Sequence, residues 1–141
     1  HVDAFIWFKE TFGEDPCGDE QGPEPPEEKL FDAIVMDLLD PNDAYKDKKL
    51  AATLYSEEML EALSCALNED GVFITNFGTA SDVDVAKEIG SKVEVLEVLG
   101  TMYEDVRPIS FYMGSRQSEW NVVVACKSAL CSQRWAFEPA R

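Results

Sequence analysis

Asp37 directly follows the short apolar run of residues 34–36 (Ile-Val-Met), and a second carboxylate, Asp40, comes three residues later. An almost unbroken apolar run is typical of a strand that helices cover on both faces, so we expect a buried strand over 31–37. Pro41 cannot donate to a strand ladder and ends it. Ligands of open α/β sheets bind beyond the carboxyl ends of the strands, where a carboxylate can accept a proton or hold a cation. Asp37 and Asp40 are therefore the first candidates for chemistry.

Three segments, in order along the chain, share the pattern of one enzyme family. They are residues 37–41 (Asp-Leu-Leu-Asp-Pro), residues 54–60, which begin Leu-Tyr-Ser, and residues 68–76, which contain a Gly-Val turn into a strand. Asp3-Ala4 and residues 120–127 add two weaker similarities. With these segments the chain resembles the aminopropyltransferases (spermidine and spermine synthases), a branch of the methyltransferase-like Rossmann folds.

The resemblance implies an α/β fold, namely a partial methyltransferase-like Rossmann sheet with an antiparallel hairpin strand. The family's glycine-rich loop and N-terminal β-rich domain have no counterpart in the sequence, which begins at His1. We therefore expect residues 1–127 to be the C-terminal half of an aminopropyltransferase-like domain and 128–141 to be a C-terminal tail. A fragment of a longer protein, a processed product and a diverged partial homologue all fit this pattern.

Aminopropyl transfer requires a neutral amine, whereas free diamines are cationic near neutral pH. An acidic residue that accepts the proton and aligns the nitrogen solves both problems. By the resemblance, Asp37 is the catalytic base and Asp40 binds the distal end of the amine. The structural alternative is that an Asp before a Pro-containing turn hydrogen-bonds to backbone amides of the loop.

The resemblance also implies further contacts with the ligands. It places Asp3 and Ala4 against the adenine of the cosubstrate, and Tyr55, Asn76 and Tyr112 beside the polyamine. From the residues alone, Asp3 could equally cap a helix, and Tyr55 could be a hydrophobic staple at a helix start. Asn76 stands where the family often has the longer Gln, and Tyr112 has no cleanly matching motif around it.

Three functions stay open. The first is a spermidine synthase-like protein that transfers an aminopropyl group from decarboxylated S-adenosylmethionine to a polyamine, and Asp37, Asp40 and Pro41 favour it. The second is an S-adenosylmethionine-dependent methyltransferase-like protein, because the two cosubstrates differ by one carboxylate. The third is a catalytically inactive remnant that acts as an interaction or structural subunit. Leu38 and Leu39, which replace small hydroxyl residues of the family, and the missing glycine-rich loop favour this third function.

The composition excludes some partners and favours others. With 28 acidic against 12 basic residues, the formal net charge is −16, and such a chain is not expected to bind nucleic acid, whose phosphates need Lys and Arg. An acidic cleft attracts a cationic diamine, although a merely solubilising acidic surface would have the same composition. No metal is expected, because the cysteines lack paired metal spacing and the chain has one His. No apolar run approaches the roughly 18 residues of a membrane span.

The cysteines suggest packing rather than chemistry. Cys65 falls on an apolar helix face and Cys126 within an apolar strand, so we expect both to pack in the core, and a reducing compartment is favoured. The compartment itself stays open. The resemblance implies the cytoplasm, and an organelle after processing also fits.

Helix and strand signals alternate along the chain, as in an α/β sheet. The expected elements are a helix over 2–12, an acidic loop over 13–28, a strand over 31–37, a helix from Ser56 to Leu67, a strand over 72–76, a helix over 81–89, a strand over 93–98, and strands over 107–113 and 119–127 joined by a hairpin loop. The strands over 31–37, 72–76, 93–98 and 119–127 should form one mostly parallel sheet in which 119–127 is antiparallel to its neighbours.

Strand 31–37 would lie at the edge of this sheet. A bare apolar edge invites association. We therefore expect the remaining half of its own domain or a protein partner to cover the strand, and a homodimer would do the same.

Overall fold

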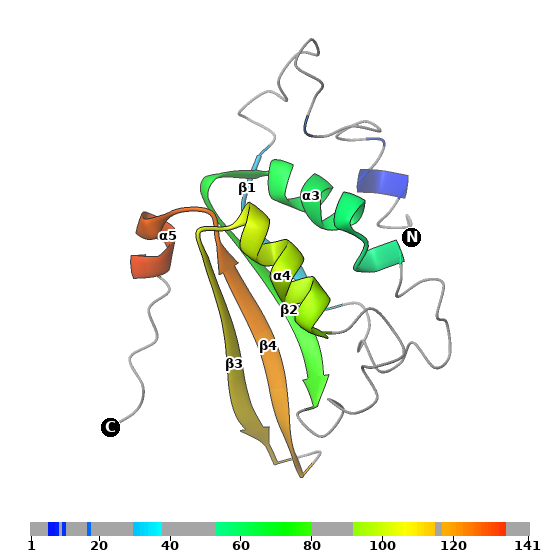
Figure 1. The fold of residues 1–141 in the computed structure, drawn as a ribbon, viewed down its shortest axis with the longest axis vertical. Coiled ribbons are helices and arrows are strands. Elements are labelled where there is room, and N and C mark those ends of the chain that lie inside the picture. The colour runs from blue at the N-terminus through cyan, green and yellow to red at the C-terminus, as the bar shows by residue number, and fades with distance from the viewer. Residues whose placement is uncertain are drawn as a thin grey trace.

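The computed structural model describes residues 6–8, 10, 17, 30–37, 53–79, 92–114 and 117–134. The elements in chain order (Figure 1) are β1 (Phe31–Met36), α3 (Glu57–Cys65), β2 (Leu67–Thr79), α4 (Lys92–Met102), β3 (Asp105–Met113), β4 (Ser118–Cys126) and α5 (Ala129–Arg134). Residues 6–8 and 10 are also helical, in agreement with the helix expected over 2–12. The rest of that helix and the helix expected over 81–89 lie outside the described residues.

In the described part of the chain, the strands form one mixed sheet in the order β1-β2-β4-β3. β1 and β2 are parallel, with Met36 beside Thr75, whereas β4 runs antiparallel to both of its neighbours. The predicted α/β sheet with an antiparallel hairpin strand is confirmed. Because β1 and β2 are parallel, their carboxyl ends lie at the same end of the sheet, where the arrowhead of β2 is drawn in Figure 1.

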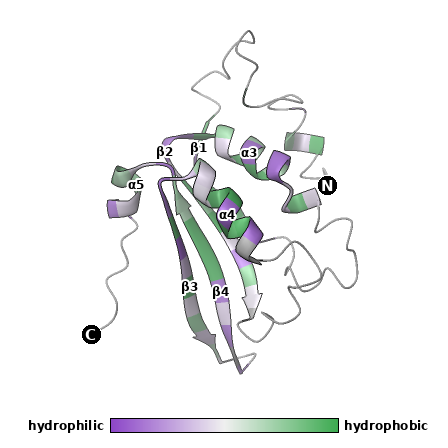
Figure 2. Ribbon diagram, in the orientation of Figure 1, coloured by the Kyte–Doolittle hydropathy of each residue, from purple (hydrophilic) through white to green (hydrophobic). Residues whose placement is uncertain are grey.

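The prediction of a strand over 93–98 is wrong, because these residues belong to α4. Val95 and Leu99, four residues apart, are buried, whereas Glu94 and Glu97 are exposed. This spacing follows the helical period rather than the strand period. Figure 2 shows the resulting mixture of hydrophobic and hydrophilic residues on α4. Burial of one helix face against the sheet overrides the weak strand preference of the valines.

α3 and α4 cover one face of the sheet (Figure 1). α3 begins after Ser56, whose hydroxyl oxygen accepts a hydrogen bond from the backbone amide of Met59 at 3.2 Å. Glu57 and Glu58 lie in the first turn, near the positive end of the helix dipole. The predicted cap at Ser56 is therefore confirmed. Leu60, on the inner side of the helix, is 1% exposed and joins the core.

The opposite face of the sheet is covered less completely. Val72 and Val124 are buried there together with Cys131 of α5, and Figure 1 shows α5 at the end of the sheet away from the arrowhead of β2. Val35 of β1, by contrast, is 65% exposed. The expectation that residues 34–36 are buried on both faces is therefore wrong for Val35. Side chains alternate along a strand, and those on either side of Val35 pack toward the helices.

The cysteines form disulfides, which the sequence did not predict. Cys17 is bonded to Cys65, and Cys126 to Cys131. Cys126 is buried as expected, whereas the expectation that Cys65 packs in the core is wrong, because Cys65 is only half-buried. The second bond ties β4 to α5, which forms within the expected tail 128–141. Because disulfides are rare in reducing compartments, the expectation of such a compartment loses its support.

Candidate functional site

The carboxyl ends of β1 and β2 and the start of α3 bring three predicted site residues together. Asp37 directly follows β1, and its neighbour Met36 pairs with Thr75 of β2, so Asp37 lies beside Asn76. Tyr55 precedes α3, and its hydroxyl donates to the carbonyl oxygen of Asn76 at 3.1 Å. We call Asp37, Tyr55, Thr75 and Asn76 the candidate site. It lies at the end of the sheet where ligands of α/β proteins bind.

The side chain of Asn76 is held at both of its polar atoms. Its Oδ1 accepts from the backbone amide of Gly78 at 2.9 Å, and its Nδ2 donates to Oδ1 of Asp37 at 3.5 Å. Gly78 follows a register shift in the ladder between β2 and β4, and its φ is 73°, in the left-handed region that favours glycine. The bulge thus directs the amide of Asn76 toward Asp37. Asp37 is exposed, so its carboxylate can still accept a hydrogen bond from a ligand.

Sequence reasoning missed Thr75, which is 0% exposed. Its Oγ1 donates to the carbonyl oxygen of Met36 at 3.3 Å and lies 3.4 Å from the hydroxyl of Tyr55. The carbonyl of Met36 belongs to the peptide group that precedes Asp37. The sequence did contain a signal for Thr75, which is a hydroxyl residue within an apolar strand, directly before Asn76. A buried hydroxyl needs a hydrogen-bond partner, so such a residue is expected to contact a polar group of a neighbouring element.

The remaining predicted site residues are not brought into this cluster. Tyr112 lies on β3, which forms the opposite edge of the sheet from β1, and is 68% exposed. The structure therefore separates Tyr112 from Asp37 by the width of the sheet. Asp3, Ala4 and Asp40 lie outside the described residues.

Two basic side chains are engaged elsewhere in the fold. Lys127 Nζ donates to the carbonyl oxygens of Ser64 and Leu67 at 3.0 and 3.2 Å, at the C-terminal end of α3 where the helix dipole favours a cation. Burial lowers the pKa of this ammonium group. On β3, a hydrogen bond from Arg107 lowers the pKa of Asp105. Neither positive charge lies in the candidate site.

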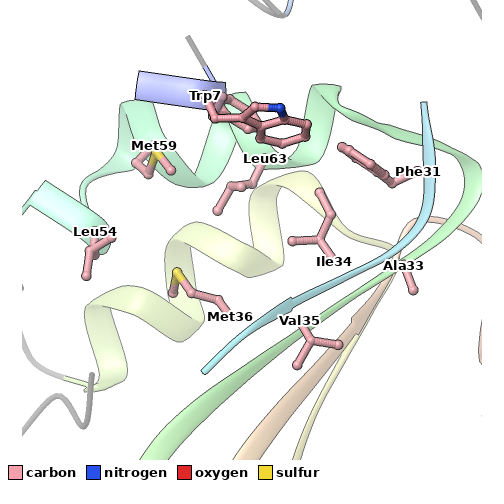
Figure 3. Close-up of a pocket in the computed structure, with 10 residues that line it drawn as sticks. Trp7, Phe31, Ala33, Ile34, Val35, Met36, Leu54, Met59 and Leu63 are labelled. Atoms are coloured by element: carbon pink, nitrogen blue, oxygen red, sulfur yellow. The ribbon is translucent and has the colours of Figure 1, made fainter. Parts of the chain in front are cut away.

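An apolar pocket of about 340 Å³ lies along β1. Figure 3 shows Ile34 and Met36 pointing from β1 toward α3, where Met59 and Leu63 form the facing wall, and Trp7 lies over the pocket. Met36, which lines the pocket, directly precedes the carboxylate of the candidate site. The pocket therefore adds an apolar surface beside an acidic group.

Within the described ranges, no group of three or more His, Cys, Asp or Glu residues could hold a metal ion. No helix among these residues is both long enough and apolar enough to cross a bilayer.

No protein-family model matches the chain. Over 95 residues, it is 30% identical to a polyamine aminopropyltransferase of Aeropyrum pernix, a match that covers 67% of this chain and 27% of that protein. The fold resembles a crystal structure of spermidine synthase in complex with the transition-state analogue AdoDATO, with a TM-score of 0.58 and 23% identity. The predicted resemblance to the aminopropyltransferases is confirmed.

The similarity to the aminopropyltransferases extends over part of their length. The chain spans 27% of the curated relative, and the structural match covers 79% of this chain and 34% of the solved one. This partial coverage is consistent with the C-terminal half of the aminopropyltransferase domain. The predicted methyltransferase-like α/β fold is likewise confirmed.

Proposed function

We propose that this chain provides the amine-binding side of a polyamine aminopropyltransferase, which transfers an aminopropyl group from decarboxylated S-adenosylmethionine to a polyamine. The observation that carries the proposal is the exposed carboxylate of Asp37 at the carboxyl end of β1, with Asn76 as its hydrogen-bond donor. The similarity to a polyamine aminopropyltransferase supports it. A net charge of −16 supports a cationic acceptor.

The chemical role of Asp37 in this reaction is proton acceptance. A polyamine nitrogen can form a bond to carbon only with a free electron pair, and it is protonated near neutral pH. Asp37 accepts a proton from the ammonium group before the C–N bond forms, which frees the electron pair of the nitrogen for attack, and Asn76 keeps the carboxylate oriented. The bound donor supplies the electrophilic carbon, and its C–S bond breaks to leave a neutral thioether.

Other residues complete the proposed ligand contacts. Tyr55 presents its phenol from the start of α3, and Asp40, three residues beyond Asp37, binds the distal ammonium group. Asp3 and Ala4 contact the adenine. Tyr112 lies on β3, across the sheet from Asp37, so it would contact only a polyamine long enough to extend that far.

An aminopropyl donor is favoured over S-adenosylmethionine. The solved spermidine synthase holds AdoDATO, a transition-state analogue, and this supports decarboxylated S-adenosylmethionine as the cosubstrate. The alternative, a methyltransferase-like reaction, predicts a methylated product. Mass spectrometry of the acceptor after incubation with each donor distinguishes the two reactions.

Calorimetric titration of putrescine and spermidine into the purified chain tests the amine site. Asp37→Asn keeps the shape of the side chain and removes its charge, so the affinity should fall about tenfold. Asp32→Asn is the matched control, because Asp32 is an exposed carboxylate at the other end of β1. Equal losses in the two variants would show that overall charge alone attracts the amine.

Transfer is tested with decarboxylated S-adenosylmethionine and putrescine, with the product identified by mass spectrometry. Asp37→Asn should lower the rate by ~10²-fold or more, as expected for the loss of a general base. Unchanged turnover in this variant would leave Asp37 with the role of a loop cap.

A second candidate is a catalytically inactive subunit that binds a polypeptide through β1. Among the described strands, β1 is at the sheet edge, Val35 on it is 65% exposed, and the apolar pocket runs along it. Such an edge pairs readily with another strand, supplied by the rest of the same domain, another protein or a second copy. Sedimentation as a well-folded monomer, with fast hydrogen exchange at the amides of 32–36, would contradict this candidate.

A further inference from the structure

We propose that Thr75 is a positioning residue, which acts together with Tyr55 to hold the backbone on both sides of the Asp37–Asn76 pair. The proposal rests on the proposed amine-binding role of Asp37. It assigns a task to a buried hydroxyl that neither touches the ligand nor accepts its proton.

The contacts of Thr75 connect three elements at one point. Thr75 lies on β2 and is 0% exposed. Its Oγ1 donates to the carbonyl oxygen of Met36, the last residue of β1, at 3.3 Å. The hydroxyl of Tyr55, from the start of α3, lies 3.4 Å from the same Oγ1. Thr75 therefore links the ends of β1 and β2, and the start of α3 lies beside its hydroxyl.

The protons of the two hydroxyls can be assigned from the distances. Each hydroxyl carries one proton. Tyr55 donates to the carbonyl oxygen of Asn76 at 3.1 Å, whereas Thr75 lies 3.4 Å from that oxygen. Tyr55 therefore serves the carbonyl of Asn76 and leaves the proton of Thr75 for the carbonyl of Met36. One arrangement satisfies both carbonyl groups.

The carbonyl groups of Met36 and Asn76 influence how the side chains of Asp37 and Asn76 are oriented. The carbonyl of Met36 and the amide nitrogen of Asp37 belong to one planar peptide group, so fixing the carbonyl fixes the backbone from which the Asp37 side chain starts. β1 ends at Met36, and the Thr75 hydroxyl therefore adds a contact where the strand ends. The carbonyl of Asn76 is fixed in the same way by Tyr55, while the side chain of Asn76 donates to Asp37.

Three substitutions separate positioning from simple packing. Thr75→Val keeps the volume and branching of the side chain and removes the hydroxyl, whereas Thr75→Ser keeps the hydroxyl. Thr101→Val is the matched control. The Thr101 hydroxyl on α4 also donates to a backbone carbonyl oxygen, that of Val98 at 2.7 Å, but Thr101 is exposed and belongs to another element. Putrescine affinity should fall about three- to tenfold in Thr75→Val, with Thr75→Ser and Thr101→Val close to the original chain.

Tyr55→Phe provides a second route if Thr75→Val does not fold. Without the phenol oxygen, the carbonyl of Asn76 has the Thr75 hydroxyl at 3.4 Å as its alternative donor. The proton of Thr75 would then be drawn from the carbonyl of Met36. We therefore expect Tyr55→Phe to weaken putrescine binding in the same direction, and the two losses to be less than additive because both variants break one network.

Nuclear magnetic resonance without any ligand makes the outcome independent of the proposed function. The Asp37 carboxyl carbon and the Asn76 side-chain amide signals should shift in Thr75→Val, and stay in place in Thr75→Ser and Thr101→Val. Unchanged signals in a folded Thr75→Val, or unchanged affinity in a chain that binds putrescine, would overturn the positioning role. Shifted signals in a chain that binds no polyamine would support the positioning role and overturn the amine site.

Discussion

The Nδ2 atom of Asn76 lies 3.5 Å from Oδ1 of Asp37, while Oδ1 of Asn76 accepts from the backbone amide of Gly78 at 2.9 Å. One amide side chain therefore connects the carboxylate at the end of β1 with a bulge in β2. The bulge and the carboxylate are separated by about 40 positions in the sequence, so the parallel pairing of β1 and β2 is what brings them together. The orientation of Asp37 thus depends on the geometry of its neighbouring strand.

Asn76→Ala should destabilise the fold by about 1–2 kcal/mol, because the amide of Gly78 loses its acceptor in a partly buried position. Urea unfolding measures the free energy. Asn121→Ala is the control, since Asn121 accepts an exposed hydrogen bond from Ser110, and its loss should cost less. Equal losses of unfolding free energy in the two variants would show that the bond from Gly78 to Asn76 contributes no more than an exposed hydrogen bond.

Gly78→Ala and Gly100→Ala should have opposite effects on the free energy of unfolding. Gly78 has a φ of 73°, and a side chain in that left-handed conformation costs roughly 1–2 kcal/mol. At Gly100, on the exposed side of α4, an added Cβ meets no atom within 4 Å, so Ala should stabilise the helix by about 0.5–1 kcal/mol. A destabilising Gly100→Ala would argue against a helix over 92–102.

The stability of the fold should fall between pH 10 and 12 because of Tyr103. Burial raises the pKa of Tyr103 from 10.0 to about 12, because the phenolate would be desolvated in the core. The folded state holds the phenol proton more tightly than the unfolded state, so this contribution is complete below pH 10.0 and is lost as the pH rises through about 12. The loss should reach about 2 kcal/mol.

Tyr103→Phe isolates that contribution in urea unfolding measured from pH 9 to 12. The variant should lose less stability than the original chain over this range, because it has no phenol to titrate. Tyr112→Phe, which alters a side chain that is 68% exposed, should keep the original pH dependence. Parallel curves for all three proteins would refute the assignment to Tyr103.

The two disulfides should differ in how readily they are reduced. Cys17 is exposed, whereas Cys126 and Cys131 are 3% and 0% exposed, and thiol–disulfide exchange needs access to a sulfur atom. Increasing concentrations of a dithiol should open Cys17–Cys65 first. Mass spectrometry of alkylated peptides identifies the order, and opening of Cys126–Cys131 first would contradict the accessibility argument. Cys17→Ser should leave the Cys126–Cys131 bond unchanged.

Several features of this protein could be predicted from the sequence because their causes are local. The cap at Ser56 depends on residues within one helical turn. The hairpin of β3 and β4 follows from two β-prone runs around a short polar loop. The position of Asp37 after an apolar run was enough to predict that it follows a strand at the end of the sheet where ligands bind.

The tertiary structure decided the features that depend on residues distant in sequence. Residues 92–102 form a helix because burying Val95 and Leu99 against the sheet outweighs the strand preference of the valines. Cys17 and Cys65 are separated by 48 positions, and only the packing of the chain brings their Cα atoms to 5.0 Å. Thr75 became part of the candidate site for the same reason. Its partners, Met36 and Tyr55, lie on other elements, and no local pattern specifies which hydroxyl will meet which carbonyl once the sheet and α3 have packed.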